Sequence, residues 1–138
     1  MKIIFQHPCE FCLDILALED RDATAAVQVT LKTSSFESES VHRLKFHMEC
    51  AQLRLFQQDL QALPLASWAQ AQLQNLDGTF KLQLSRRQAL EYQMCISWAE
   101  TKWDFRKQYG EFKQVYIMDE DALYAVIQAF EEVSYWFA

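Results

Sequence analysis

Residues 68–98 read WAQAQLQNLDGTFKLQLSRRQALEYQMCISW. Apolar and polar side chains alternate in three consecutive runs of this segment, and Asn75-Leu76-Asp77-Gly78 separates the first two runs. Successive side chains of a strand point to opposite faces of a sheet, so this period of two predicts an antiparallel meander. One face of the meander is apolar and the other is rich in amides. The outward set is Gln70, Gln72, Gln74, Gln83 and Gln93.

The segments on either side of the meander add strands to it. Residues 11–18 and 25–31 predict two strands, and residues 41–48 predict a third with Leu44, Phe46 and Met48 facing inward. The polar residues 33–40 between them are expected to form a loop or a ragged hairpin end. Residues 112–118 predict a last strand. Because both of its faces are fairly apolar, we expect it to lie centrally in the sheet.

Two segments have the period of a helix instead. Apolar residues recur at spacings of three and four from about residue 50 to 63, where Pro64 ends the pattern, and again after Asp119, which is placed to cap a helix. The chain is therefore expected to form one domain, residues 1–138, of the α+β class. We predict a two-layer sandwich in which two helices pack on one face of a mainly antiparallel sheet of about seven strands. The two apolar stripes are Leu53, Phe56, Leu60 and Leu63, and Leu123, Val126, Ile127, Phe130, Val133 and Phe137.

The charge balance narrows the class of partner. With 13 Lys and Arg against 19 Asp and Glu, the formal net charge is −6. An acidic surface repels nucleic acid and favours basic partners. No apolar run approaches the roughly 20 residues that a membrane span needs, and residues 3–5 are too short for a signal peptide. We expect a cytoplasmic protein with no nucleic-acid or membrane partner.

Cys9 and Cys12 form a Cys-x-x-Cys motif. A structural zinc site needs four ligands, and no second motif of this spacing is present. A redox pair would be expected at a helix N-terminus, whereas this pair enters a predicted strand. We therefore expect reduced cysteines with no metal and no cofactor, and a zinc-dependent module is the alternative.

The sequence contains no recognisable catalytic motif. His42 and His47 have opposite parity on their strand and are not expected to share a site, and the acidic residues 119–121 are explained by helix capping. With only Gly78 and Gly110 in the chain, there is no phosphate-binding glycine loop. We expect no enzymatic activity and no catalytic residues.

Aromatic side chains cluster between residues 98 and 112, among Lys102, Arg106 and Lys107. They are consistent with a lid over the open end of the core and also with a protein-binding surface. The cluster is Trp98, Trp103, Phe105, Tyr109 and Phe112.

Over roughly residues 11–137 the chain resembles the WapI-type immunity proteins, which are small antitoxins of bacterial contact-dependent toxins. The resemblance lies in the helix at 53–63 that a strand precedes, in the alanine-rich strand through Ala69 and Ala71, and in the strand that ends at Asp119 and runs into the helix beginning near Leu123. The chain departs from the family pattern at 119–123, which reads DEDAL where family members tend to have DQTYL, and at Ser67 and Ala89, where glycines are usual.

The resemblance implies binding without catalysis, because an immunity protein occludes or distorts its toxin through an interface. We expect a cytoplasmic immunity protein whose partner is a cognate toxin. The alternative is a structural or adaptor domain that self-associates, as a homodimer for example, through the amide-rich face. From residue type and expected exposure, the candidate toxin-binding residues are Asp20, Asp22, Glu37, Glu39, Trp103, Phe105 and Tyr109.

Overall fold

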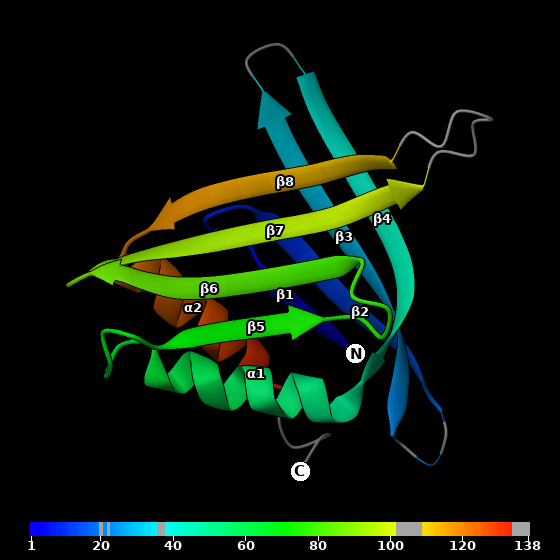
Figure 1. Ribbon diagram of the computed structural model, residues 1–138, viewed down its shortest axis with the longest axis horizontal. Helices are drawn as coiled ribbons and strands as arrows, with labels where there is room; N and C mark the ends of the chain where they lie inside the picture. The colour runs from blue at the N-terminus through cyan, green and yellow to red at the C-terminus, as the bar shows by residue number, and fades with distance from the viewer. Residues whose placement is uncertain (20, 22, 36–37, 102–108, 134–138) are drawn as a thin grey trace.

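The computed structural model describes residues 1–19, 21, 23–35, 38–101 and 109–133, with the backbone alone at 35, 100, 101, 109 and 110. It has an α+β fold with two helices and two antiparallel sheets (Figure 1). In chain order the elements are β1 (Lys2–Phe5), β2 (Glu10–Glu19), β3 (Thr24–Ser35), β4 (Ser38–Glu49), α1 (Cys50–Ala62), β5 (Gln70–Gln74), β6 (Phe80–Gln88), β7 (Glu91–Thr101), β8 (Tyr109–Met118) and α2 (Glu120–Glu131).

The strands form two four-stranded sheets with the orders β1-β2-β3-β4 and β5-β6-β7-β8. The prediction of one sheet of about seven strands is therefore wrong, although the α+β class and the antiparallel pairing are confirmed. Helix α1 separates the two meanders in the chain. Period-two alternation shows which face of a strand is buried, but it does not show which strands are neighbours.

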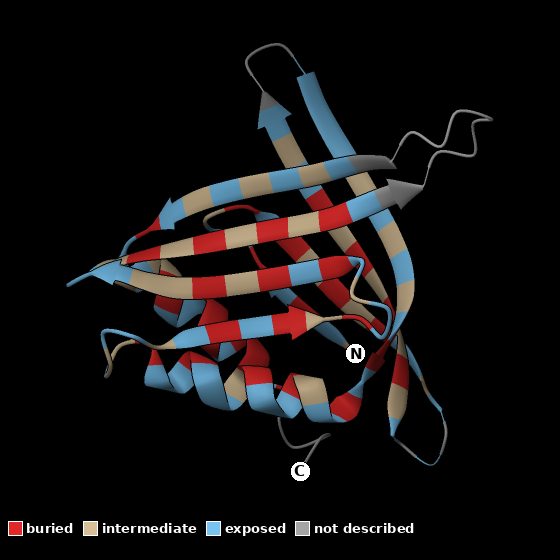
Figure 2. Ribbon diagram, in the orientation of Figure 1, coloured by how far each residue is buried: buried red, intermediate tan, exposed pale blue. Residues whose placement is uncertain are grey.

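The apolar faces of the two sheets are turned toward each other, and together they form one core (Figure 2). Phe46 of β4 and Phe80 of β6 lie with ring centroids 4.8 Å apart, and the Leu76 amide donates to the His47 carbonyl at 3.0 Å. Ala71, Leu82 and Met94 are fully buried, as predicted. Each sheet thus buries its apolar face mainly against the other sheet.

The helices complete the core at its remaining open side. Helix α1 contacts β4 and β5, while α2 contacts β1, β7 and β8. The two helices meet where the Phe56 and Phe130 rings pack edge-on, with centroids 4.8 Å apart. The Asp119 carboxylate caps α2 by accepting from the Ala122 amide at 2.8 Å, as predicted. The prediction that both helices cover one face of a single sheet is wrong, because that face is occupied by the second sheet.

One strand assignment differs from the prediction. Strand β8 lies at the edge of its sheet and not at its centre, since β7 is the only described strand that pairs with it. Its outward apolar residues Val115 and Ile117 are 47% and 51% exposed, so the two apolar faces do not reflect burial on both sides. For the segment 33–40, which was expected to form a loop or a ragged hairpin end, the hairpin end is confirmed, since β3 and β4 stay paired as far as Ser35 and Ser38.

Within the described ranges, neither α1 nor α2 has the length and apolar character to cross a bilayer.

Candidate functional site

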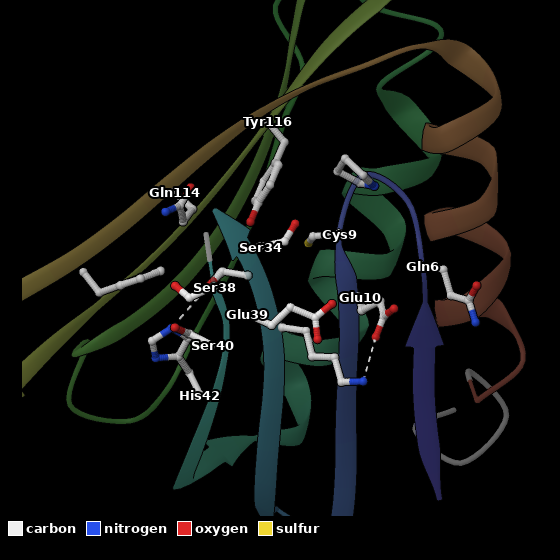
Figure 3. A pocket seen from close by; sticks show the side chains of 14 residues that line it. Gln6, Cys9, Glu10, Ser34, Ser38, Glu39, Ser40, His42, Gln114 and Tyr116 are labelled. Carbon is white, nitrogen blue, oxygen red and sulfur yellow. Dashed lines mark hydrogen bonds and ion pairs between the residues drawn. The ribbon is translucent and has the colours of Figure 1, made fainter. Parts of the chain in front are cut away.

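Two hollows follow the free edge of β8. The larger, of about 470 Å³, lies between β8 and the far ends of β3 and β4, and Figure 3 shows it from close by. The second, of about 440 Å³, continues past Ile117 to the start of α2. Pro8 lines both hollows, and the described residues that line them include none from β7. We call the two hollows together the β8 groove.

Polar groups from both sheets line the larger hollow. Phe112, Gln114 and Tyr116 line it from β8, since they lie on the same inner face of this strand as the buried Met118. Ser34 and Ser40 face them from the other sheet (Figure 3). The hollow therefore offers hydroxyl and amide groups next to one aromatic wall, a surface suited to hydrogen-bonding polar side chains.

A hydrogen bond joins the two sheets inside the groove. The Tyr116 hydroxyl donates to the Cys9 sulfur, and burial together with this contact raises the pKa of Tyr116 to about 12. Burial also raises the pKa of the Cys9 thiol to about 11, although the hydrogen bond from Tyr116 opposes the rise. Cys9 is therefore a neutral, poorly nucleophilic thiol near pH 7, which does not suit a catalytic nucleophile.

The groove is acidic. Glu10 is neutralised by Lys32 at 3.3 Å, whereas no described ion pair involves Glu39 in the larger hollow or Asp119 and Asp121 in the smaller one. Lys32 is the only lysine or arginine among the described lining residues. Asp119 and Asp121 are favoured by the positive end of α2. Glu39 lies exposed on β4, where water solvates its carboxylate.

The structure places only part of the predicted toxin-binding set. Glu39 is exposed and lies in the β8 groove. Tyr109 begins β8, but its side chain is outside the described part of the chain. The other candidates, Asp20, Asp22, Glu37, Trp103 and Phe105, also lie outside the described residues.

The described part of the aromatic cluster belongs to the core. Trp98 stacks on Phe112 with ring centroids 3.9 Å apart, and His42 lies against both rings. Trp98 is only 3% exposed, and its Nε1 is buried with no hydrogen-bond partner among the described residues. These contacts favour the lid interpretation for Trp98 and Phe112, which close the core beside the groove.

The Cys-x-x-Cys pair is divided between two environments. Cys9 is buried and bonds Tyr116 within the core, while Cys12 is half-buried on the outer face of β2 with Ile4 and Thr30 beside it. The two thiols thus face opposite sides of the sheet, which does not suit a shared metal ion. No three His, Cys, Asp or Glu side chains gather as metal ligands in the described ranges.

The histidines also separate as predicted. His42 points inward to the aromatic rings, and His47 is exposed with its Nε2 3.1 Å from the Glu19 carboxylate. A joint acid–base site from these two residues is therefore excluded by geometry.

Sequence reasoning missed the exposed apolar residues that border the groove and the α1–β5 connection. Ile117 lines the smaller hollow, and Val115 precedes it on the outer face of β8. Their position on the outer face would have identified both residues as exposed had β8 been assigned to an edge. Trp68 and Leu65 are 85% and 84% exposed in the connection that follows α1. The available signal was Pro64, where the helix ends, because Leu65 and Trp68 follow it within four residues.

Comparison of the chain with protein-family models, with curated proteins and with solved structures finds no match.

Proposed function

We propose that this protein binds a cognate bacterial toxin and neutralises it by direct contact, without catalysis. The observation that carries the proposal is the acidic β8 groove, which contains Glu39, the one predicted toxin-binding residue whose side chain the structure describes. The resemblance to WapI-type immunity proteins supports the same function.

The negative charge of the β8 groove indicates that the partner has a basic surface. Many toxins that act on nucleic acid need a basic surface to hold phosphates, and a groove with uncompensated carboxylates is complementary to such a surface. Glu39 and Asp121 stand in the two hollows of the groove, so a partner lying along β8 meets both. Covering the basic surface would block access of the toxin's substrate.

Co-expression with the product of the adjacent upstream gene tests the proposal. We expect this chain to restore growth that the toxin arrests, and we expect the two proteins to co-purify. The double variant Glu39→Lys/Asp121→Lys should weaken the complex at least about tenfold at low salt, because it replaces attraction by repulsion.

Asp59→Lys/Glu132→Lys is the matched control for charge, since it also reverses two negative charges and both residues are exposed outside the groove. It should change the affinity by less than about twofold. Failure of the wild-type chain to rescue growth, or equal effects of the groove and control variants, would contradict the proposal.

Self-association through the amide-rich face is the second candidate function. Gln70, Gln72 and Gln83 do face outward on the sheet β5–β8, and the Gln72 amide donates to Gln74 at 3.2 Å while that of Gln83 donates to Gln70 at 3.4 Å. Such a face has further donors and acceptors available for a second copy. Light scattering distinguishes the candidates: a stable dimer that Gln72→Glu/Gln83→Glu dissociates would favour an adaptor domain.

A further inference from the structure

The free edge of β8 carries backbone hydrogen-bonding groups that have no partner among the described residues. The Ala99 amide donates to the Thr79 carbonyl at 3.0 Å, so odd-numbered residues of β7 direct their backbone groups toward β6. The even-numbered residues of β7 therefore bond β8, where their register partners are also even-numbered, for example Tyr116 opposite Met94. It follows that residues 111, 113, 115 and 117 direct their N–H and C=O groups to the free edge.

This edge lacks most of the features that usually protect an edge strand. Natural edges are shortened, bulged, covered, or blocked by proline or by charged side chains, lysine above all. Of these features, β8 has the exposed charges of Glu111 and Lys113. Strand β8 runs from Tyr109 to Met118, and its register with β7 is regular throughout.

Two other sheet edges differ, because β5 is covered by α1 and β1 is contacted by α2. Strand β4 has a partly free edge, tied to Leu76 at His47, but its exposed Arg43 and Lys45 would repel a basic strand.

The groove next to the edge has room for the side chains of an added strand. A strand paired with β8 would send alternate side chains into the β8 groove, toward Glu39 and Asp121, and the others outward beside Val115 and Ile117. The inward positions thus favour lysine or arginine, and the outward positions favour apolar residues.

We propose that β8 is the docking edge for an extended segment of the partner protein, which adds to the sheet β5–β8 as a fifth strand with alternating basic and apolar side chains. The inference rests on the proposed function, because it specifies how the partner engages the same groove. Main-chain hydrogen bonds along residues 111–117 supply affinity. The carboxylates of Glu39 and Asp121 select basic side chains, and exposed Val115 and Ile117 select apolar ones.

A second copy of this chain fits the edge less well. Pairing β8 with its own copy would bring together two acidic grooves in a protein of net charge −6. The far ends of β3 and β4 extend beyond β8 (Figure 1), so the two copies would also bring these ends toward each other. A basic strand avoids the repulsion between carboxylates.

The test uses a fluorescent peptide of about nine residues with alternating lysine and valine, a length typical of strands. We expect Lys113→Pro to weaken peptide binding about tenfold, because proline removes one edge-directed N–H and obstructs the incoming strand. Since that N–H makes no bond to β7, proline is tolerated there as on other edges. A peptide with glutamate in place of lysine should bind at least about tenfold more weakly.

Lys45→Pro is the matched control. Lys45 is also an exposed lysine on an edge strand, and the Cys50 amide bond to the Ala23 carbonyl places the odd-numbered residues of β4 toward their own free edge. This variant should bind the peptide within about twofold of the wild type. Circular dichroism and thermal unfolding establish that both variants fold.

A second measurement uses the wild-type protein alone. Two versions of the lysine–valine peptide are N-methylated at alternate residues, one at each parity. The version whose methyl groups face β8 should lose binding, while the other keeps it. Equal behaviour of the two peptides, equal effects of Lys113→Pro and Lys45→Pro, or no binding of the lysine–valine peptide would overturn the proposal. A dimer that Lys113→Pro abolishes, without peptide binding, would assign the edge to a second copy.

The outcomes separate this inference from the proposed function. If Lys113→Pro keeps full growth protection against the toxin and full affinity for the peptide, the strand-addition mode fails while the antitoxin function stands. Suppose instead that only the peptide whose methyl groups face β8 loses binding, while the wild-type chain does not protect growth against the toxin. The docking edge then stands and the antitoxin function fails.

Discussion

Asn75 is the one buried polar or charged side chain in the described part of the protein, and the β5–β6 turn depends on it. Its Oδ1 accepts from the Phe80 amide at 3.0 Å, and its Nδ2 donates to the Thr79 hydroxyl at 2.9 Å. That hydroxyl in turn donates to Asp77 at 2.7 Å, and these bonds lower the pKa of Asp77. The amide thus satisfies one donor and one acceptor that the turn would otherwise leave unpaired.

Asn75→Leu should lower the free energy of unfolding by about 2–3 kcal/mol, because leucine keeps the apolar burial but leaves the Phe80 amide without its acceptor. Urea unfolding measures the change. Leu76→Asn, at the exposed neighbouring position, is the control and should cost less than about 0.5 kcal/mol. A loss below that value for Asn75→Leu would show that the side-chain bonds do not stabilise the turn.

At the scale of elements, the alternation in residues 68–98 correctly predicted β5, β6 and β7 with their buried faces, and the apolar stripes correctly predicted α1 and α2. The four-residue β1 was missed, because Ile3-Ile4-Phe5 is too short to show a period. The polar far ends of β3 and β4 left a loop and a ragged hairpin end equally open, since strands that extend beyond the core need no apolar side. Exposed Val115 and Ile117 gave β8 the appearance of a strand buried on both faces.

The hairpin between β6 and β7 offers a test of local conformation. Gln88 pairs with Glu91, so Ala89 and Leu90 form the turn, and Leu90 has a φ of 65°. A leucine in this left-handed region is strained by about 1–2 kcal/mol. Leu90 is 64% exposed, so little apolar burial compensates for the strain.

Leu90→Gly should therefore raise the free energy of unfolding by about 0.5–1 kcal/mol, the steric relief exceeding the entropic cost of glycine. Ala89→Gly is the matched control in the same turn, and it should destabilise by about 0.5–1 kcal/mol since Ala89 is outside the left-handed region. Thermal unfolding followed by calorimetry measures both changes. Destabilisation by both substitutions would refute the argument from strain.

At the scale of the molecule, the face-to-face packing of two sheets was the feature that the sequence could not supply. A pattern of inward and outward residues is the same whether helices or a second sheet cover the apolar face. The groove was missed for the same reason, since it exists only where β8 of one sheet passes the far ends of β3 and β4 of the other. Glu39 was included in the candidate set by residue type and not by knowledge of its surroundings.

The contact of Cys9 with Tyr116 makes the association of the sheets sensitive to alkaline pH. The unfolded thiol loses its proton near the ordinary pKa of 9.0, whereas the folded thiol keeps it up to a pKa of about 11. Between these values the unfolded state binds fewer protons, so the free energy of unfolding falls as pH rises. The thiol's contribution is complete below pH 9 and is lost through pH 11.

Wild-type protein should therefore lose about 1 kcal/mol more than Cys9→Ala between pH 8 and pH 10. Urea unfolding at each pH gives the free energy of unfolding of both proteins, and hence the slope of each against pH. The difference between the two slopes removes the effect of the other titrating groups. Cys12→Ala serves as the comparison on the outer face. Identical pH slopes for the wild type and Cys9→Ala would rule out this linkage.

The packing of α2 against β1 has a consequence for synthesis on the ribosome. Both meanders can form hairpins as soon as their own strands emerge, since every strand pairs with a chain neighbour. The apolar inner faces of the two sheets stay partly exposed to solvent until residues 120–131 have left the exit tunnel and α2 can pack. A nascent chain that stalls before that point would expose the apolar faces of its two sheets to solvent. Synthesis of α2 is therefore the step that protects the nascent chain from aggregation.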